Sequence, residues 1–299
     1  MKLSRLVKSK LTEDQVTYLM AGERKAHELS TMVEEALGVS KHVKVEAKRQ
    51  SIIQGPPGVG KSWTTKQTCI KHGVQPVEIA AGSTPSLIAG KFAYAQYWTP
   101  EDQEIVVIFD DADDVVFGEK KNINTWKLVF PDGEDQLPTY HHPVNMGTEI
   151  ARLKKDPKKA RMVEAMQAYM PEDETGIHIP LDRFRFIFLT NFDYEAMSLQ
   201  KNKSWMAPVV DRFNYNRLNY DKNVAWGWLS NVLLNSQPFA REGYELTEQQ
   251  KVDIIVWLGS NWDKLGNKQT YRTVREMAQY IINEPDRAVT RWEKFKVIK

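Results

Sequence analysis

The feature that most constrains this chain is the glycine-rich stretch GPPGVGKS at residues 55–62. It follows a short apolar run at 51–54 and precedes a stretch with helical periodicity. Glycines let successive backbone N–H groups turn inward toward phosphate oxygens, and the positive end of the following helix adds to that attraction. The pattern G-x-x-x-x-G-K-S between a strand and a helix therefore predicts a phosphate-binding loop. The alternative is a Gly/Pro turn that carries a lysine by coincidence.

The residue types in this loop indicate specific roles. We expect Lys61 to reach the β- and γ-phosphates of a nucleotide and the Ser62 hydroxyl to ligate Mg²⁺. The residues expected to bind the nucleotide are Gly55, Pro56, Pro57, Gly58, Val59, Gly60, Lys61, Ser62 and Trp63.

A second motif places two carboxylates at the end of an apolar run, 105–109. In P-loop enzymes the first such acid holds the magnesium ion, and a neighbouring acid orients or deprotonates the attacking water. Asp110 fits the metal role and Asp111 the water role. The alternative is a strand that ends in a solvated acidic turn, since Asp113 and Asp114 follow.

The rest of the chain alternates in the manner of an α/β protein. Short apolar runs separated by helical segments favour a parallel sheet covered on both faces. The runs predicted as strands are 51–54, 77–81, 105–109, 184–190 and, more weakly, 215–220. Helical periodicity marks 223–234, 247–258, 271–282 and 286–295, and Thr247 with Gln250 predicts a capping box.

This pattern predicts three regions. Residues 1–48 are expected to form a charged helical segment that stops at Gly38, and 49–220 an α/β nucleotide-binding domain with an insertion at 146–175. Residues 221–299 are expected to form a small helical domain.

By these motifs the chain resembles the AAA+ ATPases. GPPGVGKS is a form of the loop that this family favours, IVVIFDDAD resembles its Walker B strand, and the resemblance covers roughly residues 45–283. It implies a five-stranded parallel core followed by a helical lid, ATP and Mg²⁺ as cofactors, and a homo-oligomer, commonly a hexameric ring with nucleotide between subunits. The compact chain and its FDDAD sequence are similar to those of small ATPases encoded by bacteriophages.

The resemblance also implies three polar residues in the active site. Asn191, which ends the run 186–191, is similar to the residue that positions the attacking water; the alternative is an Asn that caps a strand end. Arg212 before Phe213 resembles the arginine that reaches a neighbouring subunit's site, with Arg217 in reserve and a surface ion pair as the alternative. Arg272, rather than Arg275, fits the lid arginine that contacts the γ-phosphate.

One departure from the family concerns the second acid. The family usually has Asp-Glu where this chain has Asp110-Asp111. An aspartate carboxylate is one methylene closer to the backbone, so we expect either slow hydrolysis or a contribution from Asp113. ATP binding is not affected by this difference.

Two features bear on the substrate, and each has two interpretations. The stretch 86–94 resembles the family's first pore loop, with Phe92 as the substrate contact beside Lys91; alternatively Phe92, Tyr97 and Trp98 pack against the protein. The run 152–161 carries six basic residues and one acidic one. It would neutralise phosphates of a nucleic acid or form a solvated helical face. The sequence thus leaves open a protein remodeller, a nucleic-acid motor such as a helicase loader or translocase, and an ATP-dependent scaffold with little turnover.

Composition sets outer bounds. A net charge of +2 gives no global argument for a nucleic-acid partner. No apolar run has membrane-spanning length, so no membrane partner is expected. The single cysteine, Cys69, excludes an internal disulfide, and we expect a cytoplasmic protein.

Overall fold

The computed structural model describes residues 5–40, 48–120, 123–130, 137–142, 146–171, 176–219, 221–236, 239 and 245–297. The chain divides into two compact units. The helical unit comprises Met1–Thr31, Gly55–Thr64 and Leu218–Lys299, and the sheet unit comprises Met32–Gln54 and Thr65–Arg217. Among the described residues, no helix is both long and apolar enough to cross a membrane.

The sheet unit is built on five parallel strands in the order β2-β3-β6-β1-β7. Their bounds are β1 Gln50–Gln54, β2 Val77–Ala80, β3 Ile105–Asp110, β6 Phe184–Thr190 and β7 Asn214–Arg217. The prediction of a five-stranded parallel sheet flanked by helices is therefore confirmed. Apolar and polar residues do not alternate regularly in β7, and the predicted run 215–220 extends beyond the end of the strand at Arg217.

Burial explains why these segments are strands. All seven residues of β6 are buried, and the first five of β3 are buried as well. A strand in the middle of a sheet covered on both faces has no solvated side, which explains its continuous apolar sequence. The edge strand β2 shows only partial burial.

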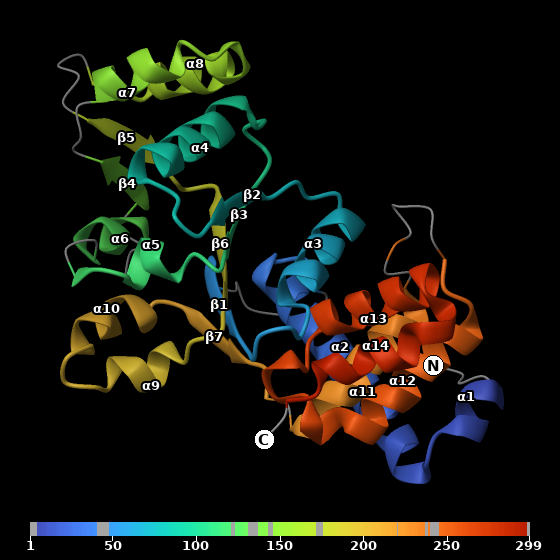
Figure 1. Ribbon diagram of the computed structural model, residues 1–299. Coiled ribbons are helices and arrows are strands. Elements are labelled where there is room, and N and C mark those ends of the chain that lie inside the picture. Colours follow the sequence, from blue (N-terminus) through green and yellow to red (C-terminus); the bar gives the residue numbers. More distant parts are fainter. Residues whose placement is uncertain are drawn as a thin grey trace. The chain divides into compact units, whose positions relative to one another are not determined.

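Helices lie on both sides of this sheet, with α3 on the opposite side from α5 and α6 (Figure 1). The helices that begin or lie in the sheet unit are α4 Pro85–Trp98, α5 Asp113–Phe117, α6 Ile123–Val129, α7 Met146–Leu153, α8 Ala160–Ala168, α9 Tyr194–Ser198 and α10 Ala207–Val210. Two further helices, α2 Glu13–Ala36 and α3 Lys61–Lys71, contribute residues to both units. As predicted, α2 stops before Gly38, which adopts a φ of 71°.

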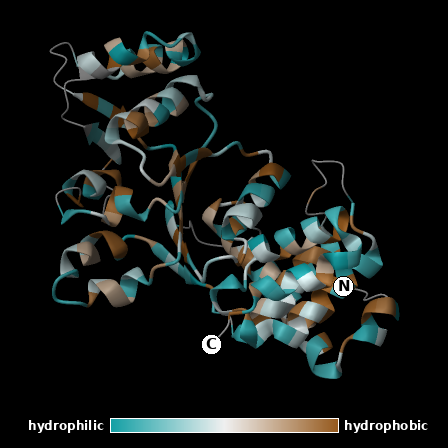
Figure 2. Cartoon of the chain, in the orientation of Figure 1, coloured by the Kyte–Doolittle hydropathy of each residue, from teal (hydrophilic) through white to brown (hydrophobic). Residues whose placement is uncertain are grey.

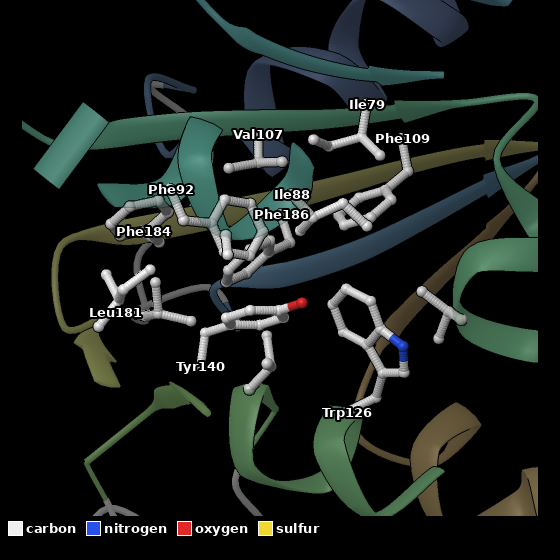
Figure 3. Packing of buried hydrophobic residues seen from close by; sticks show 14 of the residues in the cluster. Ile79, Ile88, Phe92, Val107, Phe109, Trp126, Tyr140, Leu181, Phe184 and Phe186 are labelled. Carbon is white, nitrogen blue, oxygen red and sulfur yellow. The ribbon is translucent and has the colours of Figure 1, made fainter. Parts of the chain in front are cut away.

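The core of the sheet unit is rich in aromatic rings, and Phe92 lies within it. Its side chain is 0% exposed. The ring meets Tyr140 and Phe184 edge-on at centroid distances of 5.3 and 5.5 Å, and Figure 3 shows these residues together. Phe92 therefore packs in the core, and its interpretation as a substrate contact is wrong for this structure. The packing alternative holds only in part for Tyr97 and Trp98, which contact each other but are 43% and 42% exposed.

The region between α6 and β6 holds a second sheet that the sequence analysis missed. Strands β4 Thr139–His142 and β5 Ile177–Pro180 pair antiparallel, with His141 opposite His178. Each strand has four residues, too short a window for a period-2 signal to be distinguished. The predicted insertion contains α7, the 3-10 helix Pro157–Lys159 and α8, while 172–175 lie outside the described residues.

The helical unit is built from amphipathic helices, visible in Figure 2 as alternating hydrophilic and hydrophobic segments. Its own helices are α1 Arg5–Lys10, α11 Lys222–Asn235, α12 Glu248–Asn261, α13 Tyr271–Asn283 and α14 Ala288–Trp292. The capping box of Thr247 and Gln250 is present at the start of α12. Buried tryptophans such as Trp228, Trp257 and Trp292 make up much of its core.

Replacing Phe92 by Ala tests its place in the core. Removing a fully buried phenylalanine should lower the free energy of unfolding by about 3–5 kcal/mol, measured by chemical denaturation. The matched control is Leu199→Ala, because Leu199 is 87% exposed and its loss should change stability by less than about 0.5 kcal/mol. Equal stability of the Phe92 variant and the wild type would contradict the burial.

Candidate active site

The phosphate loop connects β1 to α3 and has the backbone that its glycines predict. Gly58 and Gly60 have φ values of 78° and 76°, a region that residues with a Cβ avoid. Backbone that alternates between left-handed and right-handed residues can direct successive N–H groups into one concavity, which is how such loops hold phosphate. The local geometry of the loop is therefore suited to an anion.

The two glycines are required for a second reason, because neighbouring residues of the helical unit leave no room for a side chain. A Cβ added to Gly60 would lie 2.5 Å from the indole of Trp228 on α11. A Cβ on Gly58 would lie 2.9 Å from the Cβ of Thr270, the N-cap residue of α13. The loop is thus packed directly against α11 and the start of α13.

Lys61 is buried to 8% exposure even though its side chain carries a charge. Its ammonium donates to the carbonyl oxygens of Gly55 and Pro56 at 2.8 and 3.0 Å. Carbonyls of a loop are weaker partners for an ammonium than phosphate oxygens are, because they carry no net charge. A bound triphosphate therefore has an electrostatic advantage over the present partners of Lys61.

The other predicted loop residues differ in exposure. Val59 is buried and anchors the loop, while Ser62 is half-buried at the start of α3. Trp63 is 53% exposed, so its ring is accessible from solvent. The Ser62 hydroxyl and the Asp110 carboxylate are hard oxygen donors of the kind that Mg²⁺ prefers, and both are half-buried rather than sequestered. Their chemistry fits this metal.

Within the sheet unit, the carboxyl ends of β3 and β6 gather the predicted polar residues. Asp110 is the last residue of β3 and pairs in register with Leu189, so the neighbouring strand β6 extends one residue further, to Thr190, and Asn191 follows it. The Asn191 Nδ2 lies 3.5 Å from the Asp111 Oδ1. The strand β1 is the other neighbour of β6, and Gln54 pairs with Thr190. The strand β1 therefore ends at the same end of the sheet as β3 and β6.

Asp111 adopts a left-handed backbone, with φ at 49°, the only positive φ of a non-glycine residue in the described part of the chain. This conformation costs roughly 1–3 kcal/mol for most residues. Aspartate and asparagine are enriched in it relative to other side chains. The conformation therefore favours Asp over Glu at this position, and the Asp111 side chain is exposed.

Asp113 has different surroundings from Asp111. Its Oδ1 accepts hydrogen bonds from the Thr190 hydroxyl at 2.5 Å and from the Tyr194 hydroxyl. Burial raises the pKa of the Tyr194 phenol strongly, and the nearby Asp113 carboxylate raises it further, so the phenol keeps its proton. Asp113 thus links the end of β6 to the start of α5, and its participation in water chemistry stays a prediction.

The predicted arginines occupy unlike positions. The Arg212 guanidinium donates to the carbonyl oxygens of Lys127 and Phe130 at 2.9 and 2.6 Å, where it closes the end of α6. Arg217, at the carboxyl end of β7, is exposed and forms ion pairs with Asp193 and Glu195.

Arg272 is exposed in the first turn of α13, two residues after Thr270, which packs on Gly58. Arg275 on the next turn is over the ring of Phe239, at 5.3 Å from the centroid. Of the two arginines, Arg272 is nearer in sequence to the residue that contacts the phosphate loop. The contact of Arg272 with a γ-phosphate stays a prediction.

Sequence reasoning missed several residues of the site. Thr190 and Tyr194 bind Asp113, and Trp228 and Thr270 pack on the loop. Thr190 could have been predicted, because it directly precedes Asn191 in the sequence. Trp228 could not, because its spacing is that of any core residue of a helix. The single cysteine is unsuited to act as a nucleophile. Burial raises the pKa of the Cys69 thiol to about 11, which disfavours the thiolate form. No cluster of three or more metal-ligating side chains occurs among the described residues.

Comparisons with known proteins add little. No protein-family model and no curated protein matches the chain. One solved structure to which it is similar is C. elegans PCH-2, at 14% identity and a TM-score of 0.31. That alignment covers 89% of this chain and 60% of the other, so the chain spans less than two thirds of that protein's length. At this TM-score the similarity carries no argument about the fold or the function.

Substituting Gly60 by Ala tests the packing of the loop. Gly73 serves as a matched control because its φ of 69° is similar, but no atom lies within 4 Å of a Cβ added there. Gly73→Ala should cost only the left-handed penalty of about 1–2 kcal/mol, while Gly60→Ala should cost more because its methyl group meets Trp228. Chemical denaturation of both variants measures the difference. Equal losses would mean that the loop does not pack as described.

Proposed function

We propose that this chain is a Mg²⁺-dependent ATPase of the AAA+ type. The observation that carries the proposal is the phosphate loop, in which two glycines at positive φ precede a buried lysine whose ammonium donates to the carbonyl oxygens of Gly55 and Pro56. The sheet order supports it, because the strand that leads into the loop is separated from the acid-bearing strand by one strand, β6. The resemblance of the two motifs to that family supplies the class.

In the proposed reaction each group has a distinct task. Lys61 would hold the β- and γ-phosphates and offset the charge that develops on the transferred phosphoryl group. Ser62 and Asp110 would hold Mg²⁺, which when bound neutralises phosphate charge. Asp111 would orient the attacking water and accept its proton.

Asn191 is proposed to assist Asp111. Its amide nitrogen already lies 3.5 Å from that carboxylate, and it can donate one N–H to the carboxylate and the other to the water. Arg272 is proposed to contact the γ-phosphate from α13. Loss of the γ-phosphate on hydrolysis would then release Arg272. Its helix, α13, begins at the N-cap residue Thr270, which packs on Gly58 of the loop.

A homo-oligomeric ring is the form of assembly proposed for this ATPase. An arginine from a neighbouring subunit would complete each site by stabilising charge in the transition state. Arg212 was predicted for this role from sequence, but its guanidinium donates to main-chain carbonyls of its own subunit. Arg217 is exposed, and its partners are carboxylates on the surface, so it is the better-placed candidate. The work driven by hydrolysis would be remodelling of a macromolecule.

The assignment of Asp111 is tested by Asp111→Asn. Asparagine tolerates the left-handed backbone as aspartate does, so stability should be unchanged while the proton acceptor is lost. Steady-state ATP hydrolysis should fall by about 10²–10⁴-fold, with ATP affinity retained. Asp114→Asn is the matched control, since Asp114 is an exposed acid three residues away. Lys61→Ala should instead lose ATP binding. Undiminished turnover in Asp111→Asn would contradict the role of Asp111.

The shared site is tested by mixing variants. Arg217→Ala and Asp111→Asn should each be inactive, and their mixture should recover part of the activity, because some interfaces would pair an intact arginine with an intact Asp111. Arg212→Ala should lower the melting temperature because it frees the end of α6. If mixing restores nothing, and turnover per subunit is independent of protein concentration, the trans arginine is absent.

A further inference from the structure

Exposed aromatic rings of α4 lie beside the basic run of the sheet unit. Tyr97 and Trp98 are 43% and 42% exposed, and their ring centroids are 5.1 Å apart. The Trp98 Nε1 donates to the carbonyl oxygen of Arg161, 63 residues later, at 3.3 Å. The Arg161 guanidinium is over the same indole at 5.4 Å from the ring centroid. The tertiary fold thus supplies the aromatic rings that are missing within the basic run itself.

Close packing of α4 on α8 fixes this arrangement. A Cβ added to Gly90 would lie 2.9 Å from the Sδ of Met162, so the two helices meet there at short range. Trp98 is about two helical turns beyond Gly90, next to the start of α8. Figure 1 shows α4 and α8 side by side, apart from α9 and α10 of the same unit. The aromatic rings therefore have a defined position relative to the basic residues.

The segment that joins α7 to α8 carries concentrated positive charge. Lys154, Lys155 and Lys158 are exposed, and Lys159 is half-buried. Among the described residues these four lysines form no ion pair with a carboxylate. Asp156 and Glu164 are the only acids from 152 to 164, and the Asp156 carboxylate accepts from the backbone N–H of Lys158 at 3.0 Å. The surface therefore attracts a polyanion.

We propose that the surface formed by Tyr97, Trp98, Arg161 and the lysines 154, 155, 158 and 159 binds single-stranded DNA. The lysines would neutralise backbone phosphates, and bases would stack on the exposed rings, as in other single-strand sites that combine a basic groove with aromatic platforms. A duplex keeps its base faces inside the stack, so it would use the lysines alone. An acidic protein segment offers negative charge but no bases to stack on the exposed rings.

This proposal deepens the function proposed above, because DNA bound at this surface would be the substrate of the motor. Its role as a motor substrate rests on the ATPase assignment, but the binding step does not. The two are separable because the surface residues belong to α4, α8 and the segment before α8, and the phosphate loop and the acidic strand ends contain none of them.

The test is fluorescence anisotropy of the full-length protein with a labelled oligothymidylate of about 20 nucleotides, without ATP. Trp98→Ala should weaken binding roughly tenfold, and Trp98→Phe should retain most of it because a ring remains. The double variant Lys155→Glu/Lys158→Glu should weaken it tenfold or more, and the log–log salt slope of the wild type should be about −3 for four phosphate contacts. Thermal melting verifies that each variant is folded.

The matched control is Lys201→Glu/Lys203→Glu, which makes the same change of charge between α9 and α10. It should bind like the wild type. The proposal is overturned if this control loses binding equally, if duplex DNA of the same length binds as tightly, or if polyglutamate competes as well as the oligonucleotide. Tighter binding of an oligouridylate by tenfold or more would assign the surface to RNA and also overturn it.

ATP hydrolysis measured on the same variants distinguishes the two proposals. Basal turnover without DNA should be unchanged in the Trp98 and lysine variants, while stimulation by the oligonucleotide should be lost. If no sample hydrolyses ATP but the wild type still binds DNA, the ATPase proposal is rejected and the DNA-binding proposal is retained. Normal turnover with no DNA binding in the wild type would reject the surface and leave the ATPase.

Discussion

The parallel register of β3, β6 and β1 is the constraint on which the candidate site depends. Asp110 pairs with Leu189, and Gln54 pairs with Thr190, so three strand ends stop at one edge of the sheet. Because side chains alternate between the faces of a strand, a slip of one residue would reverse the faces of the whole strand. The full burial of β6 makes any such slip costly, and the positions of the acids follow from it.

Left-handed backbone conformations occur in both motifs that bear the proposed chemistry. Gly58 and Gly60 adopt positive φ in the phosphate loop, and Asp111 adopts it after β3. Packing also requires the two loop glycines, because an added Cβ would meet Trp228 at Gly60 and Thr270 at Gly58. At 111 the left-handed backbone favours Asp over Glu.

The sequence predicted what local patterns determine and failed where tertiary contacts decide. The buried strands β3 and β6 are continuous apolar runs, and the capping box at Thr247 is a local signal, so both were predictable. The role of Phe92 was ambiguous because a substrate-contacting phenylalanine and a buried one have the same sequence signal. The partners of Arg212 and the proximity of Trp98 to Arg161 link positions about 60 to 85 residues apart, which no period of the sequence encodes.

The central claim, that the phosphate loop binds a nucleoside triphosphate, is tested most directly by isothermal titration of the wild-type protein with ATP in the presence of Mg²⁺. The account predicts saturable binding of one ATP per chain with a Kd on the order of micromolar, about −8 kcal/mol, and much weaker binding of AMP, which lacks the phosphates that Lys61 would hold. Absence of saturable ATP binding at millimolar concentration, or equal affinity for AMP, would contradict it.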